Sequence, residues 1–383
     1  MSDRSREPAA SWLDVALLPG MDDAIFARAR AAFARPAAYF AASPERLASA
    51  TRITPARAAA LLGPDALAGA ARALETARSE ARRLIGPDDA AYPTLLREMY
   101  EPPRFLAVDG SLDDPPEKRV AIVGSRTTDR RARDAAADIA GALAARGYCV
   151  VSGLARGVDS AAHEGALAGG GRTIAVLGTG LDIVYPEENV ALARRIARQG
   201  ALVSSFPPGA RPHRHHFPIR NKTIAGLCRA VLVVQASEKS GALITARYAL
   251  HANREVFAMP GPVGDPRYVG SNRLLRDGAH LCLDLGDLVG ELEGVAAALA
   301  IWTAAESGRA GGSGATDGAL PLTGDEQAVL DHLASDPTHV DEIARDLDLP
   351  PGALLSLLLT MEIKGAVRAL PGACYARRAR LGS

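Results

Sequence analysis

KRVAIVGS, residues 118–125, is a short apolar and β-branched run that ends in Gly-Ser. Amphipathic patterns such as RRARDAAADIAGALAARG (130–147) and EENVALARRIARQG (187–200) separate several similar runs. Those runs are RFLAVDG (104–110), GYCVVSG (147–153), RTIAVLG (172–178), GALVSSF (200–206), AVLVVQA (230–236) and REVFAMPG (254–261). Strands that are apolar on both faces and alternate with helices predict an α/β domain with a Rossmann-like, doubly wound and mostly parallel sheet. We expect it to span residues 85–290.

The regions on either side have a different composition. Residues 1–84 are rich in Ala and Arg with helical apolar spacing, and Pro36, Pro44, Pro55 and Pro64 fall near expected helix starts or stops. They predict a small all-α domain, which serves either to grip a DNA backbone or as a plain packing module. Residues 291–320 include TAAESGRAGGSGATDGAL (303–320) and predict a flexible linker.

Residues 321–383 predict three helices and a hairpin, the layout of a winged-helix domain. The expected third helix, ALLSLLLTMEIKG (353–365), has almost no polar side chain that could read a base edge. This favours a protein contact, or a DNA contact through shape only, over sequence reading.

The overall charge is balanced, with 44 Lys and Arg against 44 Asp and Glu in 383 residues. Any anion site must therefore be a local patch. The N-terminus lacks the apolar run of a signal peptide, and no segment approaches the roughly 20 apolar residues of a membrane span. The four cysteines are widely separated, which argues against a zinc site or a disulfide framework. These features predict a cytoplasmic protein that does not contact the membrane.

Small residues and cations follow several of the expected strands. Because ligands bind outside the carboxyl ends of strands in an open parallel sheet, these positions predict one anion site. A basic segment, FPPGARPHRHHFPIRNK (206–222), begins at the end of another strand and is expected to be a loop. The candidates are Gly124, Ser125, Arg126, Gly153, Arg156, Arg211, Arg214, Arg220, Lys222, Lys239, Ser240 and Gly241.

Other chemistries fit the sequence less well. GTGLDI (178–183) has Ile183 where a dinucleotide fingerprint needs its third glycine, and no Walker phosphate loop is present. The histidines of the basic segment lack Cys, Asp or Glu partners at metal-ligand spacing. Asp159 and His163 lie four residues apart, which predicts a structural salt bridge or a helix cap rather than a catalytic pair. We expect no cofactor, no metal and no catalytic residue.

Several phosphate sites along one sheet edge suit a polymer better than a small molecule. Without a groove-reading element at this edge, they predict single-stranded nucleic acid on a cationic track with a few stacking side chains. Phe217, which lies between Arg214 and Arg220 in the sequence, is either such a stacking residue or a core residue.

The chain resembles a known family over about residues 85–290. The segments that carry the resemblance are VAIVGSR, GYCVVSGLARGVDSAAHEGAL, GRTIAVLGTGLDIVYPEEN, GALVSSFPPGARP, HFPIRNKTIAGLCRAVLVVQA, SGALITARYAL, REVFAMPG and GSNRLLRDGA. They are similar to those of the bacterial DNA-processing family DprA, also called Smf. The flanking regions resemble its optional SAM-like N-terminal and winged-helix C-terminal domains.

The resemblance implies a non-enzymatic protein that binds incoming single-stranded DNA during natural transformation. It also implies a homodimer formed through the Rossmann-like domain, action beside single-strand-binding protein, and loading of the recombinase RecA. The terminal domains become candidates for contact with duplex DNA. Carried over by position, the DNA-binding residues are Arg126, Arg214, Phe217, Arg220, Asn221, Lys222, Lys239, Ser240 and Gly241.

The chain departs from the family pattern at a few positions. Asp129 stands where the family usually has Ser, Gln235 where it usually has Glu, and Ala242 where it usually has Ser. Asp129 can cap the following helix, but its carboxylate lies close to the expected phosphate site.

Two rival functions remain at this stage. One is an enzyme of a related Rossmann-like fold that acts as a nucleoside-monophosphate phosphoribohydrolase, although SGALITARYAL lacks the glutamate such an enzyme would use. The other is a sequence-specific regulator that acts through the winged helix.

Overall fold

The computed structural model describes two compact units, one within Met1–Ala300 and one within Ile301–Ser383. The described residues are 11–80, 82–294, 324–333, 338–347, 349–350, 354, 357–358, 360–362, 364, 366–370 and 374–377. Most of the linker expected at 291–320 lies outside them, and its first residues, 291–294, continue a helical segment that begins at 285.

The first unit opens with short helices. They are α1 (Trp12–Ala16), α2 (Asp23–Ala32), α3 (Pro36–Phe40), α4 (Pro44–Thr51), α5 (Pro55–Leu62) and α6 (Pro64–Ser79). Each expected proline starts a helix, because the first turn needs no backbone N–H from that residue. Their core, around Ile25, Tyr39 and Leu47, continues into sheet residues such as Leu177 and Leu202.

The described part of the first unit contains one mixed sheet of nine strands in the order β1-β2-β6-β5-β4-β3-β7-β8-β9. The strands are β1 (Arg83–Ile85), β2 (Leu106–Gly110), β3 (Arg119–Val123), β4 (Cys149–Ser152), β5 (Thr173–Leu177), β6 (Ala201–Ser204), β7 (Ala230–Val233), β8 (Glu255–Ala258) and β9 (His280–Leu281). From β6 to β9 all neighbours are parallel, whereas β2 pairs antiparallel with both β1 and β6. The predicted Rossmann-like α/β fold is confirmed, and its seven expected strands are all present.

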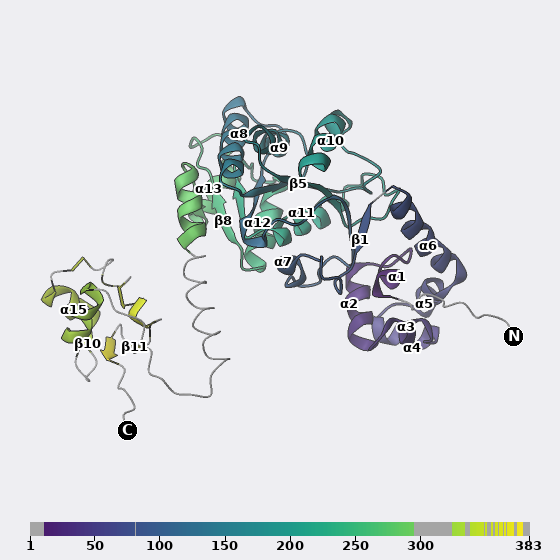
Figure 1. Cartoon of the computed structure of the whole chain (residues 1–383), viewed down its shortest axis with the longest axis horizontal. Helices are drawn as coiled ribbons and strands as arrows, with labels where there is room; N and C mark the ends of the chain where they lie inside the picture. The colour runs from purple at the N-terminus through teal and green to yellow at the C-terminus, as the bar shows by residue number, and fades with distance from the viewer. Residues whose placement is uncertain are drawn as a thin grey trace, which may run out of the picture. The chain divides into compact units, whose positions relative to one another are not determined.

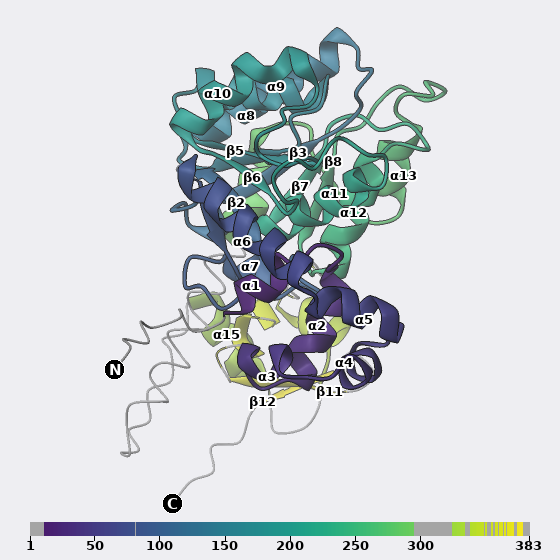
Figure 2. The same cartoon turned by 90° about the vertical axis from the view of Figure 1, so that its right-hand side faces the viewer.

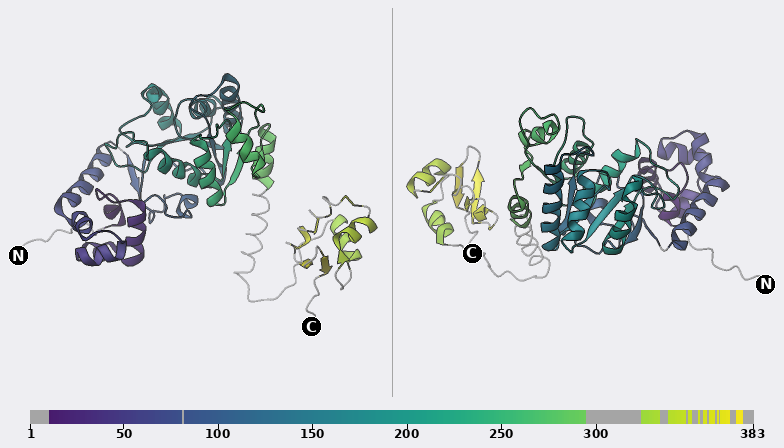
Figure 3. Two further views of the ribbon diagram at one scale, coloured as in Figure 1. Left: turned by 180° about the vertical axis from the view of Figure 1, so that it is seen from behind. Right: turned by 90° about the horizontal axis from the view of Figure 1, so that it is seen from above.

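Helices cover both faces of this sheet, as Figures 1 and 2 show. The connecting helices are α7 (Thr94–Arg97), η1 (Pro116–Lys118), α8 (Arg130–Ala145), α9 (Val158–Ala168), η2 (Glu187–Asn189), α10 (Val190–Gln199), α11 (His216–Leu227), α12 (Ala242–His251) and α13 (Val269–Arg276). Helices α8 and α9 pack on one face around Ile122 and Val150, and α11 and α12 pack on the other around Val123 and Val231. The two layers can be followed from behind and from above in Figure 3.

The strand order defines where a ligand would bind. From β3 the chain adds β4, β5 and β6 on one side, and then returns to place β7 against the other side of β3. In open parallel sheets, ligands bind in the crevice outside the carboxyl ends of the strands at such a reversal. The crevice therefore lies beyond Val123 of β3 and Val233 of β7.

The second unit has the described elements of a winged helix. They are α15 (Gly324–His332), β10 (Thr338–His339), α16 (Val340–Asp346), β11 (Val367–Leu370) and β12 (Cys374–Arg377), and the strands form an antiparallel sheet in the order β10-β12-β11. Leu354, Leu358 and Met361 are fully buried against Val329 and Ile343. The apolar character of the expected third helix thus serves the unit's own core.

Candidate nucleic-acid interface

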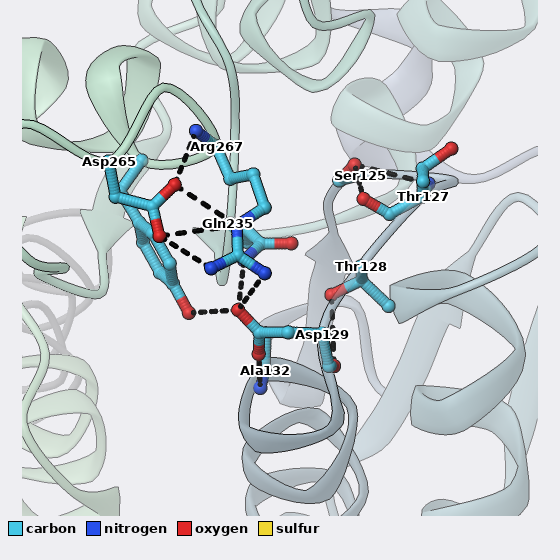
Figure 4. Close-up of polar contacts among 9 residues, drawn as sticks. Ser125, Thr127, Thr128, Asp129, Ala132, Gln235, Asp265 and Arg267 are labelled. Carbon is cyan, nitrogen blue, oxygen red and sulfur yellow. Dashed lines mark hydrogen bonds and ion pairs between the residues drawn. The ribbon is translucent and has the colours of Figure 1, made fainter.

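The turn after β3 is fixed at the crevice by hydrogen bonds. The Ser125 backbone N–H donates to the carbonyl oxygen of Gln235 over 2.8 Å, and the Ser125 hydroxyl donates to the carbonyl oxygen of Thr127 over 2.8 Å. The Ser125–Thr127 contacts are drawn in Figure 4. A Cβ on Gly124 would lie 2.6 Å from Cγ2 of Val158, so only glycine allows the turn to approach α9 this closely. Arg126 leaves this turn with its side chain exposed.

The basic segment expected to be a loop is helical from His216 onward. Pro218 is compatible with α11 because it lies in the first turn, where its missing N–H has no helical acceptor. The residues that follow Pro218 show no clear separation into a polar and an apolar helix face. Thr223–Leu227 are nevertheless buried against the sheet. The helix brings Phe217, Arg220 and Asn221 to the crevice, and the prediction of a loop was wrong for these residues.

Arg220 is buried, with 4% of its surface exposed, at the carboxyl ends of two strands. Its Nη1 donates to the carbonyl oxygen of Gly153, after β4, and over 3.1 Å to that of Val176 in β5. A Cβ on Gly153 would lie 1.7 Å from this Nη1, so any larger residue would displace the Arg220 guanidinium from this position. Burial lowers the pKa of Arg220 to about 10, and Asp159 nearby opposes that shift. The guanidinium therefore stays charged at neutral pH.

Asp159, on α9, lies at the same crevice as Arg220 and is also buried. Burial raises the pKa of its carboxyl group, while Arg220 and a hydrogen bond of 3.4 Å from the Ala155 N–H oppose the shift. His163 lies 2.7 Å from the Thr173 hydroxyl, and burial lowers its pKa to about 3. The predicted Asp159–His163 salt bridge is thus not what engages this histidine.

The turn after β7 closes the other side of the crevice. The Ser240 N–H donates to the carbonyl oxygen of Ser237 over 3.1 Å, and the Ser240 hydroxyl accepts from the Ala242 N–H over 3.3 Å. Asn221 donates from Nδ2 to the Gly241 carbonyl oxygen over 3.1 Å and so ties α11 to this turn. Lys239 is exposed beside it.

These elements enclose a cleft of about 320 Å³, here called the phosphate cleft. Of the residues predicted from the sequence, it is lined by Gly124, Ser125, Arg126, Arg220, Asn221, Ser240 and Gly241. The guanidinium groups of Arg126 and Arg220 and the carboxylate of Asp159 also line it, so two cationic groups against one acidic group favour an anion there.

A second pocket adjoins the phosphate cleft and shares Arg126 and Arg220 with it. This aromatic pocket also contains Gly153, Arg156, Tyr185 and Phe217. The Arg126 guanidinium lies 4.7 Å from the centroid of the Phe217 ring, and the Tyr185 ring lies 6.1 Å from it on a tilted plane. Arg156 is paired with Glu188, with Nη2 2.7 Å from Oε2. Sequence reasoning missed Tyr185, although an aromatic residue soon after β5, in LDIVYPEEN, could have indicated it.

Asp129 is turned away from the phosphate cleft, as Figure 4 shows. It caps α8 by accepting from the Ala132 N–H over 2.8 Å, and its other oxygen accepts from Gln235 Nε2 over 2.9 Å. Arg267 lies 3.2 Å from that oxygen, and Tyr268 donates its hydroxyl to it. The Ala132 bond lowers the pKa of the Asp129 carboxyl group, helped by these partners. Two of the three family departures, Asp129 and Gln235, thus bind each other, and the carboxylate is engaged by donors outside the cleft.

The remaining predicted residues are not brought into either pocket. Arg211, Arg214 and Lys239 are exposed near the rims, and among the described residues no side-chain hydrogen bond or ion pair engages them. Lys222 leaves α11 in another direction: its Nζ donates to the carbonyl oxygen of Glu101, in the segment between α7 and β2. Burial lowers the pKa of Lys222.

Lys222→Ala is therefore expected to change single-stranded DNA affinity by less than about twofold, since a side chain held by Glu101 does not contribute to the cleft's charge. Fluorescence anisotropy with a labelled oligonucleotide checks this. Arg126→Ala serves as the positive control in the same titration. An affinity loss for Lys222→Ala equal to that control would return Lys222 to the DNA site.

No group of three or more His, Cys, Asp or Glu side chains in the described part of the chain is arranged to hold a metal ion. Among the described helices, none is both long enough and apolar enough to cross a membrane.

The fold and the site together define a Rossmann-like protein with an arginine-lined crevice at the sheet reversal and a separate winged-helix unit. Residues 83–293 match the family model described as DNA recombination-mediator protein A, and residues 313–373 match the DprA winged-helix domain. The chain belongs to this DprA/Smf family of DNA recombination mediators.

Individual relatives agree with the family models. The chain is 36% identical over 332 residues to Protein Smf of a Synechocystis species, covering 80% of this chain and 82% of the relative. It is 42% identical over 205 residues to DNA processing protein DprA of Streptococcus pneumoniae, covering 54% of this chain and 72% of the relative.

Two solved structures are also similar. The X-ray structure of the Streptococcus pneumoniae protein matches with a TM-score of 0.63 and 32% identity, over 73% of this chain and 95% of that one. A Helicobacter pylori DNA processing protein A, described for its single-stranded DNA binding mode, matches with a TM-score of 0.50 and 27% identity, over 56% of this chain and 96% of that one.

Proposed function

We propose that this chain binds single-stranded DNA without sequence preference and loads RecA onto incoming DNA in natural transformation. The chain would act in the cytoplasm as a homodimer, beside single-strand-binding protein. The DNA would follow the carboxyl edge of the sheet, with its phosphates in the phosphate cleft and a base at the aromatic pocket.

One observation carries the DNA-binding part of the proposal. The phosphate cleft and the aromatic pocket are adjoining spaces joined by Arg126 and Arg220, so groups that can bind a phosphate lie directly beside aromatic rings at this edge. A single strand presents phosphates and unstacked bases side by side, and cationic grooves with stacking side chains are the usual way to hold it. The Helicobacter pylori relative, described as a single-stranded DNA binder, supports the choice of ligand.

The direct test is fluorescence anisotropy with labelled single-stranded and duplex oligonucleotides of two unrelated sequences, at two salt concentrations. We expect tight, salt-sensitive binding of either single strand and weaker binding of the duplex. A version lacking residues 303–383 should retain most of the single-strand affinity. No preference for single strands would sink the proposal, and release of bases from nucleoside monophosphates by the same preparation would favour the phosphoribohydrolase alternative.

Substitutions of Phe217 distinguish stacking of a base on its ring from simple packing of the ring within the protein. Phe217→Ala should cost about 1–3 kcal/mol of single-strand binding if a base stacks on its ring. The slope of log affinity against log salt should not change, because no phosphate contact is lost. Phe217→Leu keeps most of the apolar volume without a π face and should bind nearly as weakly as the alanine variant. Wild-type affinity for Phe217→Leu would mean that the ring only fills space beside Arg126.

A further inference from the structure

Three histidine rings form a compact cluster at the start of α11. The ring centroids of His213 and His215 are 4.1 Å apart, and His215 and His216 are 4.5 Å apart. His213 and His216 complete the cluster at 5.9 Å. His213 and His215 are exposed, whereas His216 is partly buried.

The histidine cluster adjoins the aromatic pocket. His216 stacks on Phe206, with centroids 4.2 Å apart, and its Nδ1 lies 3.1 Å from the carbonyl oxygen of Gly178. Gly178 lines the aromatic pocket, and a Cβ placed on it would lie 3.2 Å from Phe217 and 3.9 Å from His216. A strand that leaves the pocket past Phe217 would therefore meet the exposed rings of His213 and His215.

The charged groups around the cluster favour an anion. Arg211 precedes the exposed histidines and Arg214 lies between them in the sequence, and Arg126 and Arg220 lie over the neighbouring Phe217 ring. The acidic group of the adjoining β5–η2 connection is Asp182, which accepts from the Gly209 N–H over 2.9 Å.

Aromatic rings also lie next to the cluster. Phe206 at the end of β6 carries no charge, and Tyr185 of the β5–η2 connection lies against Phe217. Burial lowers the pKa of His216, and the other two imidazoles lower it further.

Imidazoles packed this closely cannot all be protonated without mutual repulsion. A phosphodiester that contacts the exposed edges of both His213 and His215 would offset that repulsion, because each protonated ring can donate to a phosphate oxygen. Each ring would then take a proton from the solvent as the DNA binds, and release it when the DNA leaves.

We propose that His213 and His215 form a further phosphate-binding subsite of the DNA site, one that gains its charge when the strand binds. This inference rests on the proposed single-stranded DNA binding. Bound DNA would raise the imidazole pKa above its value in the free protein. The affinity should therefore increase as the pH falls through the window from about 8 to about 6, near the ordinary pKa of histidine.

The test measures the dissociation constant of the full-length protein for labelled oligothymidylate from pH 5.5 to 8.5 at constant ionic strength. The wild type should bind about tenfold more tightly at pH 6 than at pH 8, since uptake of one proton shifts affinity by up to tenfold per pH unit. His213→Asn/His215→Asn should lose most of that dependence, and its affinity should approach that of the wild type as the pH rises to 8.5. His251→Asn, a single exposed histidine at the end of α12, is the control and should behave as the wild type.

The pH profiles decide whether His213 and His215 form the subsite. Equal pH profiles for the wild type and the double variant, or a flat wild-type profile, would overturn the subsite. The single variants His213→Asn and His215→Asn should each remove part of the dependence. Calorimetry in two buffers with different ionisation heats should show proton uptake that the double variant lacks. Absence of single-strand binding at every pH would instead overturn the proposed function itself.

Discussion

Arg126→Ala is expected to weaken single-stranded DNA binding by about ten- to a hundredfold. Arg126 is exposed, lines both the phosphate cleft and the aromatic pocket, and has no ion-pair partner among the described residues, so its charge is available to a phosphate. A hydrogen bond to a charged group contributes about 1.5–3 kcal/mol, which corresponds to that range. The variant also removes the cation that lies 4.7 Å from the Phe217 ring.

The salt dependence identifies the type of contact. The slope of log affinity against log salt should flatten by about 0.7 for the single phosphate contact that is lost. Arg130→Ala is the matched control, because Arg130 is exposed on the next turn, pairs with Asp134 and does not line the phosphate cleft. An Arg126→Ala protein with wild-type affinity and slope, or an equal loss in Arg130→Ala, would place the phosphate site elsewhere.

Arg220→Met is expected to destabilise the folded protein by roughly 2–5 kcal/mol, because each buried acceptor left without its donor costs about 1–3 kcal/mol and buried Asp159 loses a nearby positive charge. These acceptors are the carbonyl oxygens of Gly153 and Val176. Urea unfolding followed by circular dichroism measures the loss. Arg156→Met is the control, because Arg156 lines the aromatic pocket together with Arg220. Arg156 is exposed and paired with exposed Glu188, so this substitution should lower the free energy of unfolding by less than about 1 kcal/mol.

A second substitution distinguishes charge from packing at Arg220. Adding Asp159→Asn to Arg220→Met removes the uncompensated carboxylate and should restore part of the lost stability. If the double variant is as unstable as the sum of the two single variants, the two side chains do not interact, and the cost arises from the lost carbonyl contacts alone.

Local patterns predicted much of this structure. Strands buried on both faces, such as β3 and β5, are continuous apolar runs, and prolines such as Pro44 mark helix starts because only the first turn accepts them. The antiparallel strand β1 was not predicted, because its three residues RLI are too short to form a pattern. The start of α11 was not predicted, because its basic residues suggested an exposed loop. Arg220 is instead buried through contacts with strand ends that lie 44 and 67 residues earlier in the chain.

A cleft at the carboxyl edge of the sheet could be predicted from the sequence, but only some of the predicted residues line it. Residues directly after parallel strands, such as Gly124 and Gly153, meet at one edge for topological reasons, so their proximity follows from the strand order. The direction of a long side chain depends on its tertiary neighbours instead. Lys222 and Arg220 are two residues apart on one helix, yet Arg220 donates to Gly153 after β4 whereas Lys222 donates to Glu101 between α7 and β2.

Three consecutive residues of α11, Arg220, Asn221 and Lys222, each donate to a main-chain oxygen on a different element. A helix held in this way has little freedom to move when a ligand arrives, so the loss of conformational entropy on binding falls mainly on the DNA strand. Encounter with the site would then require no rearrangement of the protein. Differences in affinity among variants of the exposed side chains would appear chiefly as differences in how long the strand stays bound.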